Sequence, residues 1–401
     1  MNPYFEKLGR KVLERWREQN FSLEVFPELA RIAMDETPPS ENVDLEEMIH
    51  EFLTNDDQPL QGHSGFGQPE LVAFNDSRFY IQILFWMEGT TDIHQHEFSG
   101  AFHVMRGSSV HSEFDFVGAH SVTPHIRTGE LRLKQIELLE TGRTVPIISG
   151  RECIHSLFHL DTPSVTVVVR THHDPGTGPQ YNYLPPHIAI DPIHADSLTM
   201  RRKQLLDVLE NLDHPSYALQ VNEMIESLDF ERGFHTLHHA MDRLQVLGEW
   251  ESVLAIFQEK HGNLAKGVPA TLAENLRRET ISQMRYHIDN PEHRFFLALL
   301  MNVQNSKDIQ ALITERYPDQ SPNETILRWA EELIEPADFG LTLLDAAFPE
   351  TIEVDIDTQF DLLIDTLKNA LNESPENNTT TAEYSEIHAV LTSSCLRPLF
   401  C

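Results

Sequence analysis

Three histidines are spaced so that they could hold one metal ion. His94 and His96 are two residues apart in the run GTTDIHQHEFSG, and His155 follows much later in GRECIHSLFH. Side chains two apart on a β-strand point to the same face, so both imidazoles of the first run can reach one ion. Neutral imidazoles suit iron, zinc, copper or nickel, and ligand softness alone does not choose among these metals. The pattern predicts a metal site at His94, His96 and His155; the alternative is a set of polar barrel residues that bind no metal.

The residues around these histidines are typical of short strands. From about residue 70 to residue 171, runs rich in β-branched and aromatic residues, such as FYIQILFW and SVTVVV, are separated by Gly, Pro, Asn and Asp. Many short strands with regular turn signals indicate a sandwich or a barrel. The same segment holds further histidines, and we expect most of them to lie at the surface or to line a pocket without binding metal. These are His103, His111, His120 and His125.

Helical periodicity flanks the strand-rich segment on both sides. Near the N-terminus, Phe5, Leu8, Val12 and Trp16 recur at helical spacing, and from about Ser197 onward every apolar run has a helical period. We expect Ser197 to be the N-cap of the first helix after the strands.

We therefore expect an α+β chain in two main parts, a β-barrel followed by an all-α domain. Residues 1–69 form N-terminal helices that pack on the barrel, and residues 70–192 form the barrel with the metal site. Residues 193–401 form a helical domain of the bundle or solenoid type. A length of 401 residues is too great for one typical core.

Composition excludes several classes of protein. Thirty basic and 63 acidic residues give a net charge of −33, which repels nucleic acid and anionic membrane surfaces. No apolar run reaches the about 18 residues of a membrane span. The charged N-terminus lacks the apolar core of a secretion signal, so we expect a cytoplasmic protein. Three cysteines without a CxxC pair suggest neither a disulfide framework nor a zinc ribbon.

The first histidine run resembles the first motif of the cupin family. In that motif a glycine and a short spacer precede His-x-His, a carboxylate ligand follows three or four residues on, and a later glycine closes the run. Gly89, His94, His96 and Gly107 match this pattern, whereas Gly100 stands at the carboxylate position. The resemblance implies a cupin β-barrel of the jelly-roll type with three histidine ligands.

The second run resembles the second cupin motif, with Pro146, Gly150 and His155 in the expected order. The gap from Gly150 to His155 is longer than usual, and His159 stands where asparagine is common. Because a metal-bound histidine usually donates its other N–H to a nearby group, we expect His159 to be such a partner.

Within the cupins, the chain is most similar to the cysteine dioxygenase (thiol dioxygenase) group. An apolar strand ending in Trp-x-Glu-Gly, then Ile-His-x-His, a second apolar strand and a Gly turn all occur in ILFWMEGTTDIHQHEFSGAFHVMRGS. Many bacterial members also have glycine at the position of Gly100. The resemblance implies Fe(2+) as the cofactor and O2 as a co-substrate, while Zn, Mn, Ni or Cu stay open.

The chain departs from this group at the residues that bind the substrate. That group holds its substrate carboxylate with an early arginine and has a tyrosine shortly after the third histidine. The early region here, QPELVAFNDS, has no arginine, and the tyrosine position, counted from Pro163, is Arg170. We expect Arg170, which shares a strand face with Thr166 and Val168, to bind an anionic group in a bidentate manner. The alternative is a surface arginine at a strand end.

The resemblance implies an oxygenase that acts on a small anionic molecule, either a thiol other than cysteine or a similar chelating compound. We expect Phe85, Phe102 and Val168 to line its pocket. One alternative is a metal-dependent isomerase or hydrolase without redox chemistry. Another is a ligand sensor whose helical half binds a partner. Because cupins commonly pair through their sheets, we also expect a homodimer.

Overall fold

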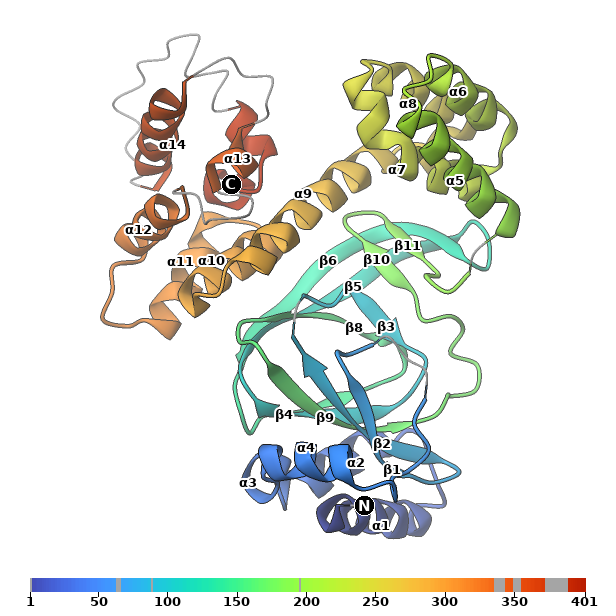
Figure 1. Ribbon diagram of the computed structural model, residues 1–401, viewed down its shortest axis with the longest axis vertical. Helices are drawn as coiled ribbons and strands as arrows, with labels where there is room; N and C mark the ends of the chain where they lie inside the picture. Colours follow the sequence, from blue (N-terminus) through green and yellow to red (C-terminus); the bar gives the residue numbers. More distant parts are fainter. Residues whose placement is uncertain are drawn as a thin grey trace.

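The structure is a computed structural model, and it describes residues 2–62, 66–87, 89–194, 196–334, 343–348, 355–371 and 389–401. Strands form its lower half in Figure 1, with four N-terminal helices beneath them and the remaining helices above. The predicted α+β class, with a barrel part and a helical part, is confirmed. The jelly-roll connectivity and the domain boundaries stay predictions.

The strands form two groups that enclose a cavity. A five-stranded sheet has the order β1 (Glu70–Asn75), β2 (Phe79–Trp86), β9 (Ser164–Thr171), β4 (Gly100–Arg106) and β7 (Thr144–Ile147). A closed barrel is formed by β10 (Asn182–Leu184), β11 (Ile188–Ile190), β6 (Ile126–Leu139), β5 (Ser109–Ser121), β8 (Gly150–His159) and β3 (His94–His96). All strand pairs are antiparallel.

The N-terminal helices cover the outer face of the five-stranded sheet (Figure 1). They are α1 (Pro3–Glu18), α2 (Phe26–Asp35), α3 (Pro39–Asn42) and α4 (Leu45–Thr54). The apolar stripe of α1 is buried, as its spacing predicts, with Phe5 and Val12 fully enclosed. Burial of one such side chain stabilises the fold by about 1.5–3 kcal/mol. Covering this face leaves the opposite face of the sheet for the cavity.

The helical part begins with a capping residue other than the one we expected. The carboxylate of Asp196 accepts a hydrogen bond from the Thr199 N–H (2.8 Å), so Asp196 is the N-cap and the prediction of Ser197 is wrong. Ser197 is the first residue inside the helix. Aspartate and serine are comparably good N-caps, and adjacent candidates cannot be separated by preference alone.

Two groups of helices follow, joined by the long helix α9 (Val268–His287), which crosses above the barrel in Figure 1. The first group comprises α5 (Ser197–Asn211), α6 (Tyr217–Ser227), α7 (Phe230–Val246) and α8 (Trp250–His261). The second comprises α10 (Pro291–Asn302), α11 (Ser306–Arg316), α12 (Pro322–Ile334), α13 (Leu343–Ala347) and α14 (Ile356–Leu371). In the described part of the chain, short 3-10 helices lie at Gly262–Ala265 and Arg397–Phe400. Among the described residues, none of the helices combines the length and apolar character needed to cross a membrane.

The barrel and the second helical group share one hydrophobic core. Val110, Phe158 and Leu160 of the barrel part belong to the same cluster as Met284 of α9 and Phe295 of α10. Two buried arginines reinforce this junction through the end of β8 and the turn that follows.

The first of these arginines is Arg285, whose guanidinium donates to the carbonyl oxygen of His159 at 3.1 and 2.9 Å. The second is Arg294, which donates to the carbonyl oxygen of Leu160 (3.3 Å) and to Thr162 Oγ1 (2.7 Å). Strand β8 is therefore held from above by helices α9 and α10.

Candidate metal centre

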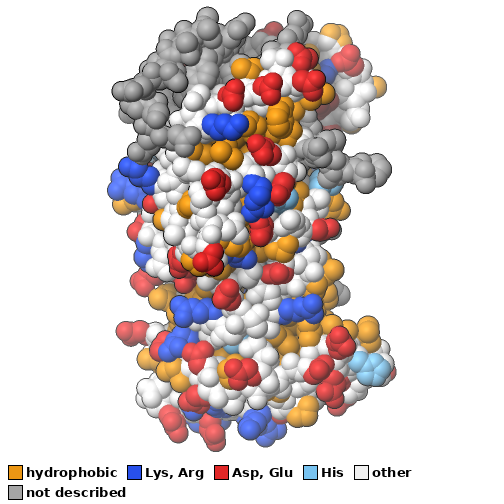
Figure 2. Space-filling view, turned by 90° about the vertical axis from the view of Figure 1, so that its left-hand side faces the viewer, with side chains coloured by type: hydrophobic (Ala, Val, Ile, Leu, Met, Phe, Trp, Pro, Cys, Tyr) orange, Lys and Arg blue, Asp and Glu red, His pale blue; other side chains and the backbone are white. Residues whose placement is uncertain are grey.

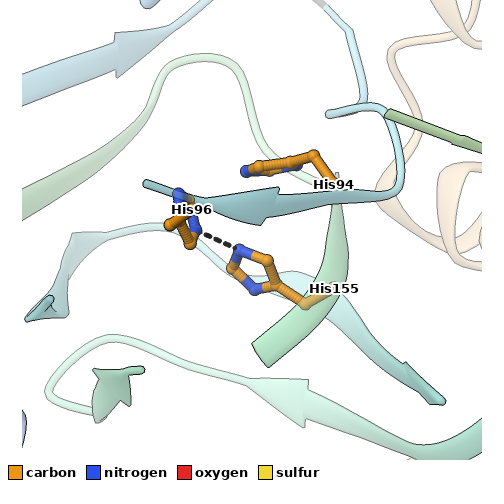
Figure 3. Close-up of side chains that lie close together, drawn as sticks. All are labelled: His94, His96 and His155. Atoms are coloured by element: carbon orange, nitrogen blue, oxygen red, sulfur yellow. Dashed lines mark hydrogen bonds between the residues drawn. The ribbon is translucent and has the colours of Figure 1, made fainter. Parts of the chain in front are cut away.

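The three predicted histidines meet inside the barrel. His94 and His96 come from β3, and His155 comes from the neighbouring β8, where it pairs directly with His94. Their rings point toward one another in Figure 3, and one nitrogen from each lies within 4.8 Å of the other two. The side chains are 3–4% exposed. The structure thus brings together the residues that the sequence proposed as ligands.

The hydrogen bonds assign a tautomer to His94. Its Nδ1 lies 2.8 Å from the carbonyl oxygen of Asp92. A carbonyl only accepts, so Nδ1 carries the proton and Nε2 keeps a lone pair. Within the described residues that Nε2 is buried and has no hydrogen-bond partner. A buried polar atom without a partner costs about 1–3 kcal/mol, and a metal ion would satisfy it.

His96 and His155 face each other through the same type of atom. Their Nε2 atoms are 2.8 Å apart, as the dashed line in Figure 3 marks. Two nitrogens that bind one ion at about 2.1 Å and at right angles to each other lie about 3 Å apart. The observed separation is close to this value, so the donor set fits a divalent transition metal.

The electrostatic environment keeps all three imidazoles neutral. Burial lowers the pKa of His94. It lowers the pKa values of His96 and His155 further, with added repulsion from the neighbouring histidines. Neutral imidazole is the form that binds metal, since a protonated ring nitrogen offers no lone pair.

A side chain is excluded at residue 100, the position that the resemblance to the cupin motif assigns to a carboxylate ligand. Gly100 lies opposite Arg170 in the pairing of β4 with β9. A Cβ atom built on Gly100 would overlap the carbonyl oxygen of Val169 and lie 2.9 Å from the Cα of Arg170. Any side chain here would push the two strands apart. The backbone packing thus leaves position 100 without a ligand side chain.

The cavity beside the histidines is narrow and mostly apolar. Apart from the three histidines, only Gln82, Thr91 and Thr166 contribute polar side chains to its described lining. Gln82 Oε1 is buried and, among described residues, lacks a hydrogen-bond partner. The apolar lining comprises Phe66, Leu84, Trp86, Phe98, Phe102, Ile147, Leu157 and Val168.

Two of the three predicted lining residues are in place, and the third is wrong. Phe102 and Val168 line the cavity. Phe85 instead packs in the cluster formed with the N-terminal helices. Because successive residues of β2 face opposite sides, Leu84 and Trp86 point into the cavity while Phe85 points away.

Arg170 lies behind the cavity wall. It shares a strand face with Thr166 and Val168, as expected, but its guanidinium packs over the ring of Phe98 at 3.3 Å. It also donates to the carbonyl oxygens of Thr171 (3.3 Å) and His172 (3.5 Å). In the described part of the chain, Phe98 thus separates Arg170 from the cavity, and its role as a substrate anchor stays a prediction.

His159 lies on the far side of Trp86 from the cavity. The two rings stack with centroids 4.7 Å apart, and His159 Nδ1 is 2.9 Å from Ser109 Oγ. Burial lowers the pKa of His159 to about 3, so the ring is neutral. A role for His159 in catalysis stays a prediction, since its polar contact is with Ser109 and not with a histidine of the metal centre.

The hydrogen bond expected from His159 is made by His111. Its Nε2 lies 2.9 Å from Nδ1 of His155, and both side chains are buried. His111 was expected to lie at the surface or to line the pocket, and its contact with His155 was missed. Only the pairing of β5 with β8 brings the two residues together, and sequence spacing carries no signal for that register.

Comparison with known proteins adds little to this description. No protein-family model matches the sequence, and no curated protein matches it either. Three of the solved structures that match parts of the chain are the following. Hydroquinone 1,2-dioxygenase from Sphingomonas sp. TTNP3 has 10% identity over 27% of this chain and 68% of its own, with a TM-score of 0.22.

A cupin-2 domain-containing protein from Shewanella frigidimarina has 13% identity over 32% of this chain and 94% of its own, with a TM-score of 0.20. Oxalate decarboxylase from Lactobacillus farciminis has 14% identity over 29% of this chain and 31% of its own, with a TM-score of 0.21. TM-scores this low support no inference about activity. A proposal about function therefore depends on the three histidines and the cavity beside them.

Proposed function

We propose that the chain is a metal-dependent oxygenase of the three-histidine cupin type. The observation that carries the proposal is the convergence of three buried, neutral imidazoles, from His94, His96 and His155, in the lining of an apolar cavity. Gly100 leaves no room for a ligand side chain at its own position. Iron(II), when bound, would supply open coordination positions and the electrons needed for reaction with O2.

Side chains that line the cavity exclude water from the site and fix its shape. Leu84, Phe102 and Val168 exclude water from the histidines, which strengthens the interactions of a charged group bound there. Trp86 is held in the wall by a hydrogen bond from its Nε1 to Thr166 Oγ1 (3.1 Å). Gln82 offers an amide to a polar atom of the substrate.

The cavity favours a small substrate with an apolar body. Its described lining has no cationic side chain, so an anionic group would have to reach Arg170 past Phe98. Rotation of Phe98 away from the guanidinium would open that path. A thiol or another group that chelates metal would face the histidines, in keeping with the resemblance to the thiol dioxygenases.

The proposal is tested by metal analysis of protein purified without oxygen. We expect the wild type to contain about one iron per chain, and the His94→Ala, His96→Ala double variant to contain none. His103→Gln is the matched control, because His103 is buried but bonds to Thr144 and Ser40, away from the site.

An oxygen electrode with a panel of thiol acids and other small chelators then tests the reaction. We expect the wild type and the His103→Gln control to consume O2 and the double variant to consume none. Wild-type protein that retains no metal under these conditions would overturn the proposal. Stoichiometric zinc with anaerobic turnover would replace the oxygenase with a metal-dependent isomerase or hydrolase.

A further inference from the structure

A line of three side chains leads from the metal centre toward the surface of the barrel. It starts at His155, continues through His111, whose Nε2 is 2.9 Å from His155 Nδ1, and ends at Glu137. Glu137 Oε1 lies 3.3 Å from His111 Nδ1. The side chains of His111 and Glu137 are 1% and 25% exposed, so the line runs from the interior to the solvent.

Strand pairing fixes this line. His111 on β5 pairs directly with Glu137 on β6 and with Leu157 on β8, two residues beyond His155. Directly paired residues of antiparallel strands have neighbouring side chains on one face of the sheet. The contacts between the three residues therefore follow from the register of β5, β6 and β8.

The protons along the line have one arrangement that is compatible with a metal. If His155 presents the lone pair of Nε2 to the ion, its proton is on Nδ1 and is donated to Nε2 of His111. The proton of His111 is then on Nδ1, from which it is donated to the carboxylate of Glu137. The hydrogen bond from His111 lowers the pKa of Glu137, which keeps that group an acceptor.

We propose that His111 and Glu137 are positioning residues that hold His155 in its metal-binding tautomer and orientation, and that they thereby raise the affinity for the metal. This inference rests on the proposed metal centre. Partners of ligand histidines act in this way in metal sites generally, and their loss typically costs 10–100-fold in affinity or activity.

A competing explanation is a second metal ion. His111, Glu113 and Glu137 could also hold an ion, since their donor atoms lie within 4.8 Å of one another. An ion on Nδ1 of His111 would move its proton to Nε2, which would then face the proton on Nδ1 of His155. Two donors would oppose each other at 2.9 Å, so the two ions are mutually exclusive.

The experiment measures Co²⁺ affinity with a competing chelator on the full chain. His111→Met removes the acceptor, and we expect it to weaken binding by about 10–100-fold. His111→Gln places an amide oxygen close to the position of Nε2, and we expect it to restore most of the affinity. Glu137→Met, at a partly exposed position, is expected to weaken binding in the same direction by a smaller factor, even if His111→Met folds poorly.

Glu113→Gln is the matched control, because Glu113 belongs to the same group of residues but makes no hydrogen bond to His111 in the described structure. We expect it to bind one Co²⁺ with wild-type affinity. In the Co²⁺-loaded protein, the paramagnetically shifted proton on His155 Nδ1 should exchange slowly with water in the wild type and in this control. It should exchange fast in His111→Met.

The outcomes separate the positioning role from the metal centre itself. Wild-type protein that binds no Co²⁺ would remove the metal centre and this inference with it. Unchanged affinity and unchanged proton exchange in both His111→Met and Glu137→Met would overturn the positioning role alone. Loss of Co²⁺ binding in Glu113→Gln would overturn it in favour of an ion held by His111, Glu113 and Glu137.

Discussion

At the scale of single residues, Gly100 determines what kind of centre the barrel can build. The close approach of β4 to β9 at this position leaves no room for a Cβ, so a carboxylate ligand cannot be introduced without moving a strand. The glycine is thus required by backbone packing, in keeping with the proposed ligand set of three histidines.

This argument predicts a stability cost for Gly100→Ala. Overpacking of a tight site typically costs about 1–3 kcal/mol, and we expect a loss of that size in the free energy of unfolding, measured by urea denaturation. Gly62→Ala is the control, because a Cβ there would meet nothing within 4 Å. Equal stability of both variants would show that the strands adjust freely and that packing does not exclude a fourth ligand.

A second prediction at this scale concerns pH and His103. Burial lowers the pKa of His103 to about 4, whereas an unfolded histidine titrates near 6.5. Between these values the unfolded chain binds a proton that the folded chain does not, so stability falls as the pH drops from about 6.5 toward 4. The full effect of this one group is about 3 kcal/mol.

The measurement is the free energy of unfolding of the metal-free protein at pH 7, 5.5 and 4.5. We expect His103→Gln to lose less stability over this range than the wild type, since it removes the titrating group. Other buried histidines, including His159 with a pKa of about 3, contribute to the remaining slope in both proteins. Identical slopes would mean that His103 becomes protonated in the folded state at little cost.

At the scale of strands and helices, local patterns could be predicted and pairings could not. The two-residue spacing of His94 and His96 is local, and it correctly placed both rings on one face. The apolar run of β2 is buried on both sides, by helices and by the cavity wall, so alternation gave no sign of which side Phe85 faces. That is why Phe85 was assigned to the wrong side.

The pairing of strands that are distant in sequence explains why the contact between His111 and His155 was missed. His111 reaches His155 only because β5 pairs with β8 in one register, and a shift by one residue would turn His111 to the opposite face. For Arg170, too, the sequence predicted the strand face but not the neighbouring side chains. Its strand face was predicted from parity, but Phe98, which lies between it and the cavity, comes from the loop after β3.

At the scale of the whole molecule, acidic side chains are spread over the surface, as the face in Figure 2 shows. On that face the acidic side chains form no single patch, and the exclusion of nucleic acid as a partner, which the net charge of −33 suggests, stays a prediction. The homodimer also stays a prediction. The feature with a direct consequence is the core shared by the barrel and the second helical group.

That shared core predicts that the barrel and helices α9 and α10 unfold together. Arg285 and Arg294 bind the backbone of residues 159 and 160, at the end of the strand that carries His155. Hydrogen bonds from charged groups contribute about 1.5–3 kcal/mol each, and a buried carbonyl left without its partner adds to the loss. We expect Arg294→Met to lower the protection of amides against hydrogen exchange, and to lower it equally in β8 and in α10.

The control is Arg10→Met, because Arg10 lies on the exposed face of α1 and, among the described residues, pairs only with Glu6, one helical turn away. Exposed pairs of this kind contribute little, so we expect protection in β8 and α10 to stay as in the wild type. If Arg294→Met lowered protection in α10 while β8 kept its own, the barrel would be an independent folding unit. The geometry at His155 would then be independent of the helices. If the two parts unfold together, that geometry depends on the packing of α9 and α10.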